Sequence, residues 1–150
     1  MAITGLHNLQ VVRGLSGNRS LLSCNGDGTV VDLWSQDDAS GRQVWDVQLV
    51  PGYTDLVHIT VSKGVSGGRR YLSCTADGSK VDLWSEDDRS GRQRWQIVPL
   101  NDSTICNYFN VMVSAGVSGG RVYLSCTADG TKVDLWNQDD GSGRQRWQLQ

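Results

Sequence analysis

Three residue types that can hold a polar ligand recur three times along the chain at one fixed spacing. Each copy reads Asp-x-Trp, two residues, Asp-Asp, three residues, Arg. Carboxylates accept hydrogen bonds, guanidinium groups donate them, and an indole offers an apolar face. A pyranose has both hydroxyls and C–H patches, so this set predicts a sugar-binding site. The candidate site residues are Asp32, Trp34, Asp37, Asp38, Arg42, Asp82, Trp84, Asp87, Asp88, Arg92, Asp134, Trp136, Asp139, Asp140 and Arg144.

The same residues do not form a pattern typical of catalysis. Catalytic groups are normally unique and come from different elements, whereas these polar residues occur in triplicate. His7 and His58 occupy different positions in their copies and belong to no motif with Cys or Ser. Asp87 and Asp88 are adjacent, which does not place two carboxylates on either side of a glycosidic bond. We therefore expect no enzymatic activity, no metal site and no cofactor.

Charge and hydropathy exclude other classes of partner. The formal net charge is -2 and the pI is about 5.5, so the chain lacks the basic field that nucleic acid requires. No stretch approaches the run of about 20 apolar residues that inserts into a membrane. The first residues lack the basic and apolar regions of a secretory signal. The sequence predicts a cytoplasmic protein, with release by a non-classical route left open.

The repeats define the elements that must position these residues. Trp34, Trp84 and Trp136 are spaced by 50 and 52 residues, which predicts one domain over 1–150 with repeats near 1–50, 51–100 and 101–150. Glycine-rich turns separate short segments rich in β-formers, so the chain is expected to be all-β. In the second copy the strands are expected at 58–64, 70–75, 80–86 and 92–98. Asp77-Gly78 predicts a hairpin turn.

No single copy could bury its apolar face alone, so the three must close on one another. Both the β-trefoil and the β-prism are compatible with this threefold repetition. Each copy ends in GRQVW or GRQRW and contains VDLW, which resembles the Q-x-W signature of ricin B-type lectins. The GRxYLSxxxDG run is also similar to repeats of the fascin type. The resemblance implies a β-trefoil with pseudo-threefold symmetry and, as partners, glycans of the galactose or N-acetylgalactosamine type.

The resemblance also implies roles for the closing residues of each copy. Three tryptophans are expected to pack inward while the preceding glutamines satisfy backbone groups. These residues are Trp45, Trp95 and Trp147, with Gln43, Gln93 and Gln145. At the position where ricin-type sites use an amide, this chain has Arg92, and the family's early aspartate has no counterpart in Leu72-Ser73-Cys74. Asp87 or Asp88 is expected to replace that acceptor, with Arg92 either contacting sugar or bracing the turn.

The two-residue period of a strand assigns the faces of Lys80 to Trp84. Val81 and Leu83 share the core face, and Asp82 and Trp84 share the outer face. We expect each site to be built from its own repeat and Leu33, Leu83 and Leu135 to be buried around the axis. The repeated cysteines Cys24, Cys74 and Cys126 cannot pair evenly across a threefold axis, so free thiols are expected.

Two other functions remain open at this point. A trefoil protease inhibitor would use one unique loop such as VPLNDSTICNYFN (98–110). A fascin-like trefoil would bind protein, and its actin cosedimentation would be insensitive to sugar. Haemagglutination inhibited by simple sugars separates both from a lectin. Homodimerisation would add further sugar sites to a lectin.

Overall fold

The computed structural model describes residues 3–100 and 107–150, and every regular element within these ranges is a β-strand. The predicted all-β class is therefore confirmed. In the second repeat, β6 (Val57–Val61) begins one residue before the expected 58–64 segment and ends inside it, and β7 (Tyr71–Cys74) lies inside the expected 70–75 segment. The fourth expected strand begins later than predicted, at Trp95, because residues 92–94 still belong to the preceding turn.

Six strand positions close into a barrel. The first position is interrupted at Asn8, which divides it into β1 and β2. Neighbouring positions pair antiparallel around the ring, from β1 through β5, β6, β9, β10 and β13 back to β2. The barrel strands are β1 (Gly5–His7), β2 (Leu9–Val11), β5 (Trp45–Leu49), β6 (Val57–Val61), β9 (Trp95–Pro99), β10 (Tyr108–Val113) and β13 (Trp147–Leu149).

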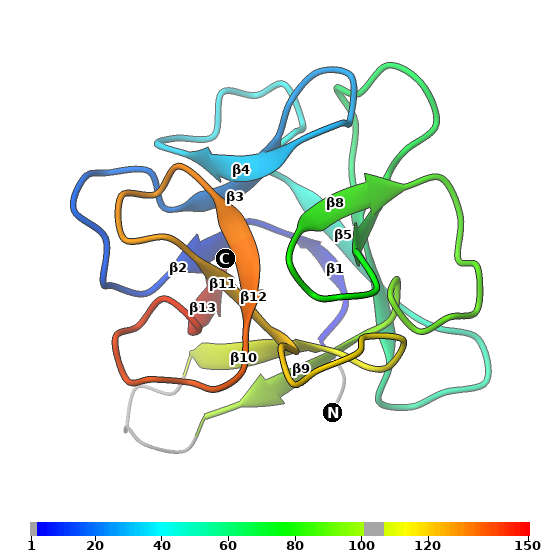
Figure 1. Cartoon of the computed structure of the whole chain (residues 1–150). Coiled ribbons are helices and arrows are strands. Elements are labelled where there is room, and N and C mark those ends of the chain that lie inside the picture. Colours follow the sequence, from blue (N-terminus) through cyan, green and yellow to red (C-terminus); the bar gives the residue numbers. More distant parts are fainter. Residues whose placement is uncertain (1–2, 101–106) are drawn as a thin grey trace.

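Three hairpins cover one end of this barrel, and their second strands contact one another pairwise. Figure 1 shows the three hairpins arranged around a common centre, each with its own set of loops. A barrel of six strand positions capped by three hairpins is the β-trefoil, so the predicted fold is correct. The hairpin strands are β3 (Leu21–Cys24) with β4 (Val31–Trp34), β7 (Tyr71–Cys74) with β8 (Val81–Trp84), and β11 (Tyr123–Cys126) with β12 (Val133–Trp136).

The predicted hairpin turn is present in each repeat. Between β7 and β8, the carboxylate of Asp77 accepts hydrogen bonds from the side chain of Thr75 and from both the backbone and the hydroxyl of Ser79. Gly78 has a φ of 72°, and a Cβ there would lie 3.2 Å from the carbonyl oxygen of Arg121. Glycine is therefore required both by the backbone conformation and by the approach of the next repeat.

The core contains the residues that the repeat pattern assigned to it. Leu33, Leu83 and Leu135 are fully buried, as expected. Trp95 is also fully buried, and its indole N–H donates to the carbonyl of Leu72 at 2.9 Å. The Gln93 side chain accepts the backbone N–H of Asp88 and donates to the Ser73 hydroxyl. The other two repeats make the same bonds, which confirms the inward role of the closing tryptophans and glutamines.

The repeated thiols are buried and unpaired, as predicted. Burial raises the pKa of the Cys24, Cys74 and Cys126 thiols to about 12. Cys106 and about half of the loop proposed for a protease inhibitor (98–110) fall at 101–106, outside the described residues. The three thiols therefore act as small apolar groups in the core.

Candidate functional site

Strand β8 presents its residues in the alternation expected from the sequence. Val81 and Leu83 are buried, Asp82 is half-buried, and the Trp84 side chain is 40% exposed. Asp82 and Trp84 therefore share the outer face. The strands β4 and β12 have the same burial pattern, so the arrangement occurs three times.

A pocket of about 200 Å³ opens beside this face. It is lined by Asp82, Trp84, Asp88 and Arg92, all of them predicted site residues, together with Gln93 and the end of β7. In the first and third repeats the residues that match Asp88 and Arg92 make the same turn and backbone contacts. In the second repeat the structure thus brings together four of the five predicted residues around one pocket.

Asp82 is the most unusual residue in the pocket. Its Oδ1 atom is buried and has no hydrogen-bond partner among the described residues, and the same is true of Oδ1 in Asp32 and Asp134. Burial raises the pKa of the Asp82 carboxyl, and the charges of Lys80, Arg69 and Arg92 oppose this shift. A buried acceptor left unpaired costs about 1–3 kcal/mol. The pocket therefore contains an acceptor that a hydrogen-bond donor would satisfy.

Asp88 and Arg92 form the outer wall of the pocket. Nη2 of Arg92 lies 3.6 Å from Oδ2 of Asp88, while Nη1 donates to the carbonyl of Gly116 at 3.3 Å. Hydrogen bonds from the Ser90 side chain and backbone lower the pKa of the Asp88 carboxyl. Of the two roles considered for Arg92, these contacts correspond to bracing the turn. The Asp88–Arg92 pair lies at the surface and contributes under about 1 kcal/mol.

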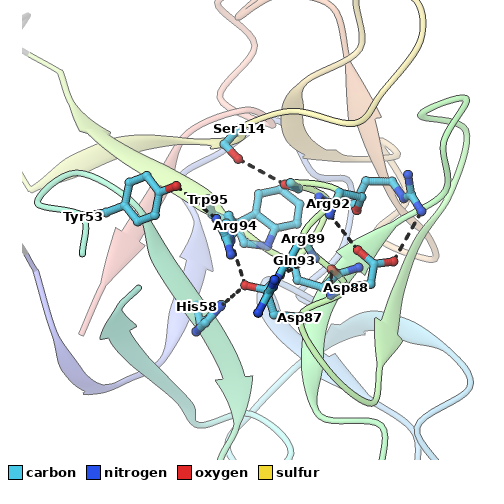
Figure 2. A network of polar contacts seen from close by, with 12 residues as sticks. Tyr53, His58, Asp87, Asp88, Arg89, Arg92, Gln93, Arg94, Trp95 and Ser114 are labelled. Carbon is cyan, nitrogen blue, oxygen red and sulfur yellow. Dashed lines mark hydrogen bonds and ion pairs between the residues drawn. The ribbon is translucent and has the colours of Figure 1, made fainter. Parts of the chain in front are cut away.

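Asp87 points away from the pocket, toward barrel strand β6. Figure 2 shows its carboxylate between His58 and Arg94, whereas Asp88 faces Arg92. Oδ2 of Asp87 lies 2.6 Å from Nε2 of His58 and accepts Nε–H of Arg94 at 2.8 Å. Although burial opposes the shift, these bonds lower the pKa of Asp87 to about 2.

The equivalents of Asp87 are also turned toward the barrel. Asp37 accepts a hydrogen bond from Asn8, and Asp139 accepts bonds from Asn110 and Arg146. Of the predicted site residues, Asp37, Asp87 and Asp139 thus join each turn to the barrel instead of lining the pocket. Adjacent aspartates in one turn must point in different directions, and the sequence alone did not distinguish them.

The sequence analysis missed an arginine at each site. The guanidinium carbon of Arg69 lies 5.5 Å from the ring centroid of Trp84, a cation–π distance. Arg19 over Trp34 and Arg121 over Trp136 lie at 5.2 and 5.5 Å. These arginines precede the first hairpin strand in a glycine-rich run that resembles an ordinary turn. Their recurrence in all three copies was the signal that could have identified them.

The residues that line the second pocket all come from the second repeat, and a loop of the following repeat supports them from outside. The carbonyl of Ala76, in the wall of the pocket, accepts the backbone N–H of Ser118 at 2.7 Å. Gly116 from the same loop accepts the bond from Arg92. The second repeat supports the first site through Ser66, and the first repeat supports the third through Ser16. The tertiary fold forces this arrangement because neighbouring loops meet at every repeat boundary.

Other site types have no support in the described part of the chain. No group of three or more His, Cys, Asp or Glu side chains in it could hold a metal ion. Among residues 3–100 and 107–150, no helix is long and apolar enough to cross a membrane.

Comparison with known proteins identifies relatives by fold. No protein-family model and no curated protein sequence matches the chain. Among solved structures, the designed threefold-symmetric protein ThreeFoil is 21% identical with a TM-score of 0.69, and the match covers 97% of each chain. SeviL bound to the asialo-GM1 saccharide is 13% identical with a TM-score of 0.66, covering 99% of this chain and 98% of that one.

A third match is the Polyporus squamosus lectin bound to the human-type influenza-binding epitope Neu5Acα2-6Galβ1-4GlcNAc. It is 15% identical with a TM-score of 0.70, and the match covers all of this chain and 50% of that lectin. The chain thus has the β-trefoil fold and resembles carbohydrate-binding trefoil lectins in structure.

Proposed function

We propose that this chain is a multivalent lectin with one carbohydrate site per repeat and no catalytic activity. The observation that carries the proposal is the unpartnered Oδ1 of Asp82 in a pocket beside the exposed indole of Trp84. A sugar hydroxyl that donates to Oδ1 would supply the missing hydrogen bond, and the C–H face of the pyranose would pack against the indole. The same pair recurs as Asp32 with Trp34 and Asp134 with Trp136.

For the sugar we propose glycans of the galactose or N-acetylgalactosamine type. The resemblance of the Q-x-W and VDLW segments to ricin B-type lectins supports this class. The epitope bound to the structurally similar Polyporus squamosus lectin also contains galactose. A glycan array with galactosides, glucosides and mannosides tests the class directly.

Affinity at one site should be modest because the pocket is small. High-micromolar to millimolar binding corresponds to roughly -4 to -6 kcal/mol. Three sites on one rigid domain could raise the apparent affinity for a glycan-coated surface by about 10² or more. The lectin would therefore act through multiplicity and agglutinate cells.

The test of this function is the triple substitution Trp34→Ala, Trp84→Ala and Trp136→Ala. These side chains are 38–40% exposed, so the variant should fold while sugar binding by calorimetry is lost. Trp95→Ala is the matched control, since its fully buried indole should cost about 3–5 kcal/mol of stability. Unchanged sugar binding by the folded triple variant would overturn the proposed site.

A further inference from the structure

At every site an arginine that forms no ion pair with the described residues lies over the indole. Arg19, Arg69 and Arg121 are exposed, and none forms an ion pair with any residue at 3–100 or 107–150. The guanidinium of Arg69 instead lies over Trp84, and its central carbon is 5.5 Å from the centroid of the indole ring. Stacking on an aromatic ring leaves the N–H groups at the edge of a guanidinium free to donate.

Arg69 lies close enough to Asp82 for its charge to act on that carboxyl. It nevertheless does not bond Oδ1 of Asp82, which has no partner among the described residues. The pocket and the surface beside it at Trp84 therefore present two different groups to a ligand. Asp82 offers an acceptor for a neutral hydroxyl, and the rim at Arg69 offers a planar set of donors. Such donors match the two oxygens of a carboxylate or of a sulfate ester.

A lysine lies near the second and third sites, outside the lining of the pocket. Lys80 directly precedes β8, two residues before Asp82, and lines a different hollow together with Lys132. Its charge still opposes the raised pKa of Asp82. Lys132 has the same role for Asp134, while the first repeat has Val30 at this position. With Asp82 and Asp88 against Arg69 and Arg92, the charges of site two sum to zero. The corresponding residues of the first and third sites have the same balance.

We propose that these sites bind acidic glycans, in which a neutral pyranose faces Asp82 and a neighbouring carboxylate or sulfate group lies against the arginine on the indole. This proposal rests on the proposed lectin function and specifies the substrate class of the same site. It also assigns to Arg69 a direct ligand contact, in contrast to the bracing role of Arg92.

The test uses a protein with one working site. In a background with Asp32→Asn and Asp134→Asn, calorimetry compares 3′-sialyllactose, 3′-sulfated lactose and lactose at low and high salt. We expect at least one acidic ligand to bind about tenfold more tightly than lactose, as one charge-assisted hydrogen bond implies, with the advantage reduced by salt. The two acidic ligands distinguish a carboxylate from a sulfate ester.

The variant Arg69→Met should then lose the preference for the acidic ligand and retain lactose binding, and Arg69→Lys should restore part of the preference. Lys63→Ala is the matched control. This change removes one exposed cation from the same repeat. Alanine is compatible with the fold at this position because the third repeat already has Ala115 there. It should leave the preference unchanged.

Two results would overturn the acidic-glycan proposal while leaving the lectin function intact. One is equal affinity for the acidic and neutral ligands. The other is a parallel loss of both in Arg69→Met, which would mean that the arginine only positions Trp84. By contrast, failure of the folded wild-type protein to bind any glycan would overturn the lectin function itself.

Discussion

The pKa values of two aspartates in the second repeat are shifted in opposite directions by the fold. Asp87 is bonded to His58 and Arg94, and its pKa is lowered to about 2. Asp82 has an unpartnered buried oxygen, and its pKa is raised by burial. Ionisation therefore stabilises the folded protein at Asp87 and destabilises it at Asp82. An energetic cost at a repeated pocket residue is typical of a binding group that awaits its partner.

The first prediction separates stability from binding at Asp82. Because the pKa of Asp82 is raised in the folded state, the protein is more stable with this carboxyl neutral, and that stability is lost as the pH rises and the carboxyl ionises. Asp82→Asn removes that charge in nearly the same shape and should raise the melting temperature slightly. The same change should abolish binding at the second site. Thermal melts and calorimetry measure both effects, and a variant that binds as wild type would contradict the role of the carboxylate.

The second prediction concerns acid stability at Asp87. Its folded-state pKa of about 2 lies below the ordinary value of 3.8. The stabilisation from the ionised carboxylate is therefore present above about pH 4 and is lost as the pH falls toward 2. Asp87→Asn should unfold at lower urea concentration than wild type at pH 6, and the difference should shrink near pH 2.5. A difference that stays constant with pH would show that the ionised group is not responsible.

At the scale of elements, the loops carry the site and the strands orient it. Strand β8 aims Asp82 and Trp84 outward, but the wall formed by Asp88 and Arg92 is held by a loop of the next repeat. Gly116 in that loop has a φ of 86°, and a Cβ there would lie 2.6 Å from the carbonyl oxygen of Ser90. The two loops can approach this closely only because one of them has no side chain at the contact.

The third prediction follows from this contact. Gly116→Ala should impair the second site, although Gly116 belongs to the third repeat, and should lower the free energy of unfolding by about 1–2 kcal/mol. The third site should be affected less. Binding measured with only the second or only the third site intact checks this. Gly120→Ala in the same loop is the control, because its Cβ would meet nothing nearer than 4.0 Å.

At the scale of the whole molecule, three repeats close one barrel and one core. Cys24, Cys74 and Cys126 lie in that core at 3% exposure, and each has a pKa of about 12. A thiol that is both buried and protonated reacts slowly because the thiolate is the nucleophile. The reactivity of these three residues should therefore report on unfolding of the barrel.

The fourth prediction is that a thiol reagent at pH 8 labels these three cysteines only slowly in the native protein. In denaturant all three should react at once. Mass spectrometry of digested samples assigns the label to each residue and keeps Cys106 separate. Rapid native labelling of any of the three would contradict their burial.

The sequence by itself determined the features that depend on local pattern and on repetition. Alternation along a strand was enough to assign Val81 and Leu83 to the core and Asp82 and Trp84 to the surface. Triplication required the repeats to close on one another, and the resemblance of their Q-x-W endings to ricin B-type lectins implied the β-trefoil and the inward position of Trp95. These inferences succeed because the period of a strand and the need to bury an apolar face act on each segment in the same way.

The tertiary structure decided the contacts between segments far apart in the chain. Only the fold places His58 against Asp87 and so turns that carboxylate away from the pocket, leaving Asp88 at its wall. Only the fold lays Arg69 over Trp84 and brings Gly116 of the next repeat to Arg92. The direction of a turn side chain depends on partners supplied by barrel closure, and no local period encodes which partners those are.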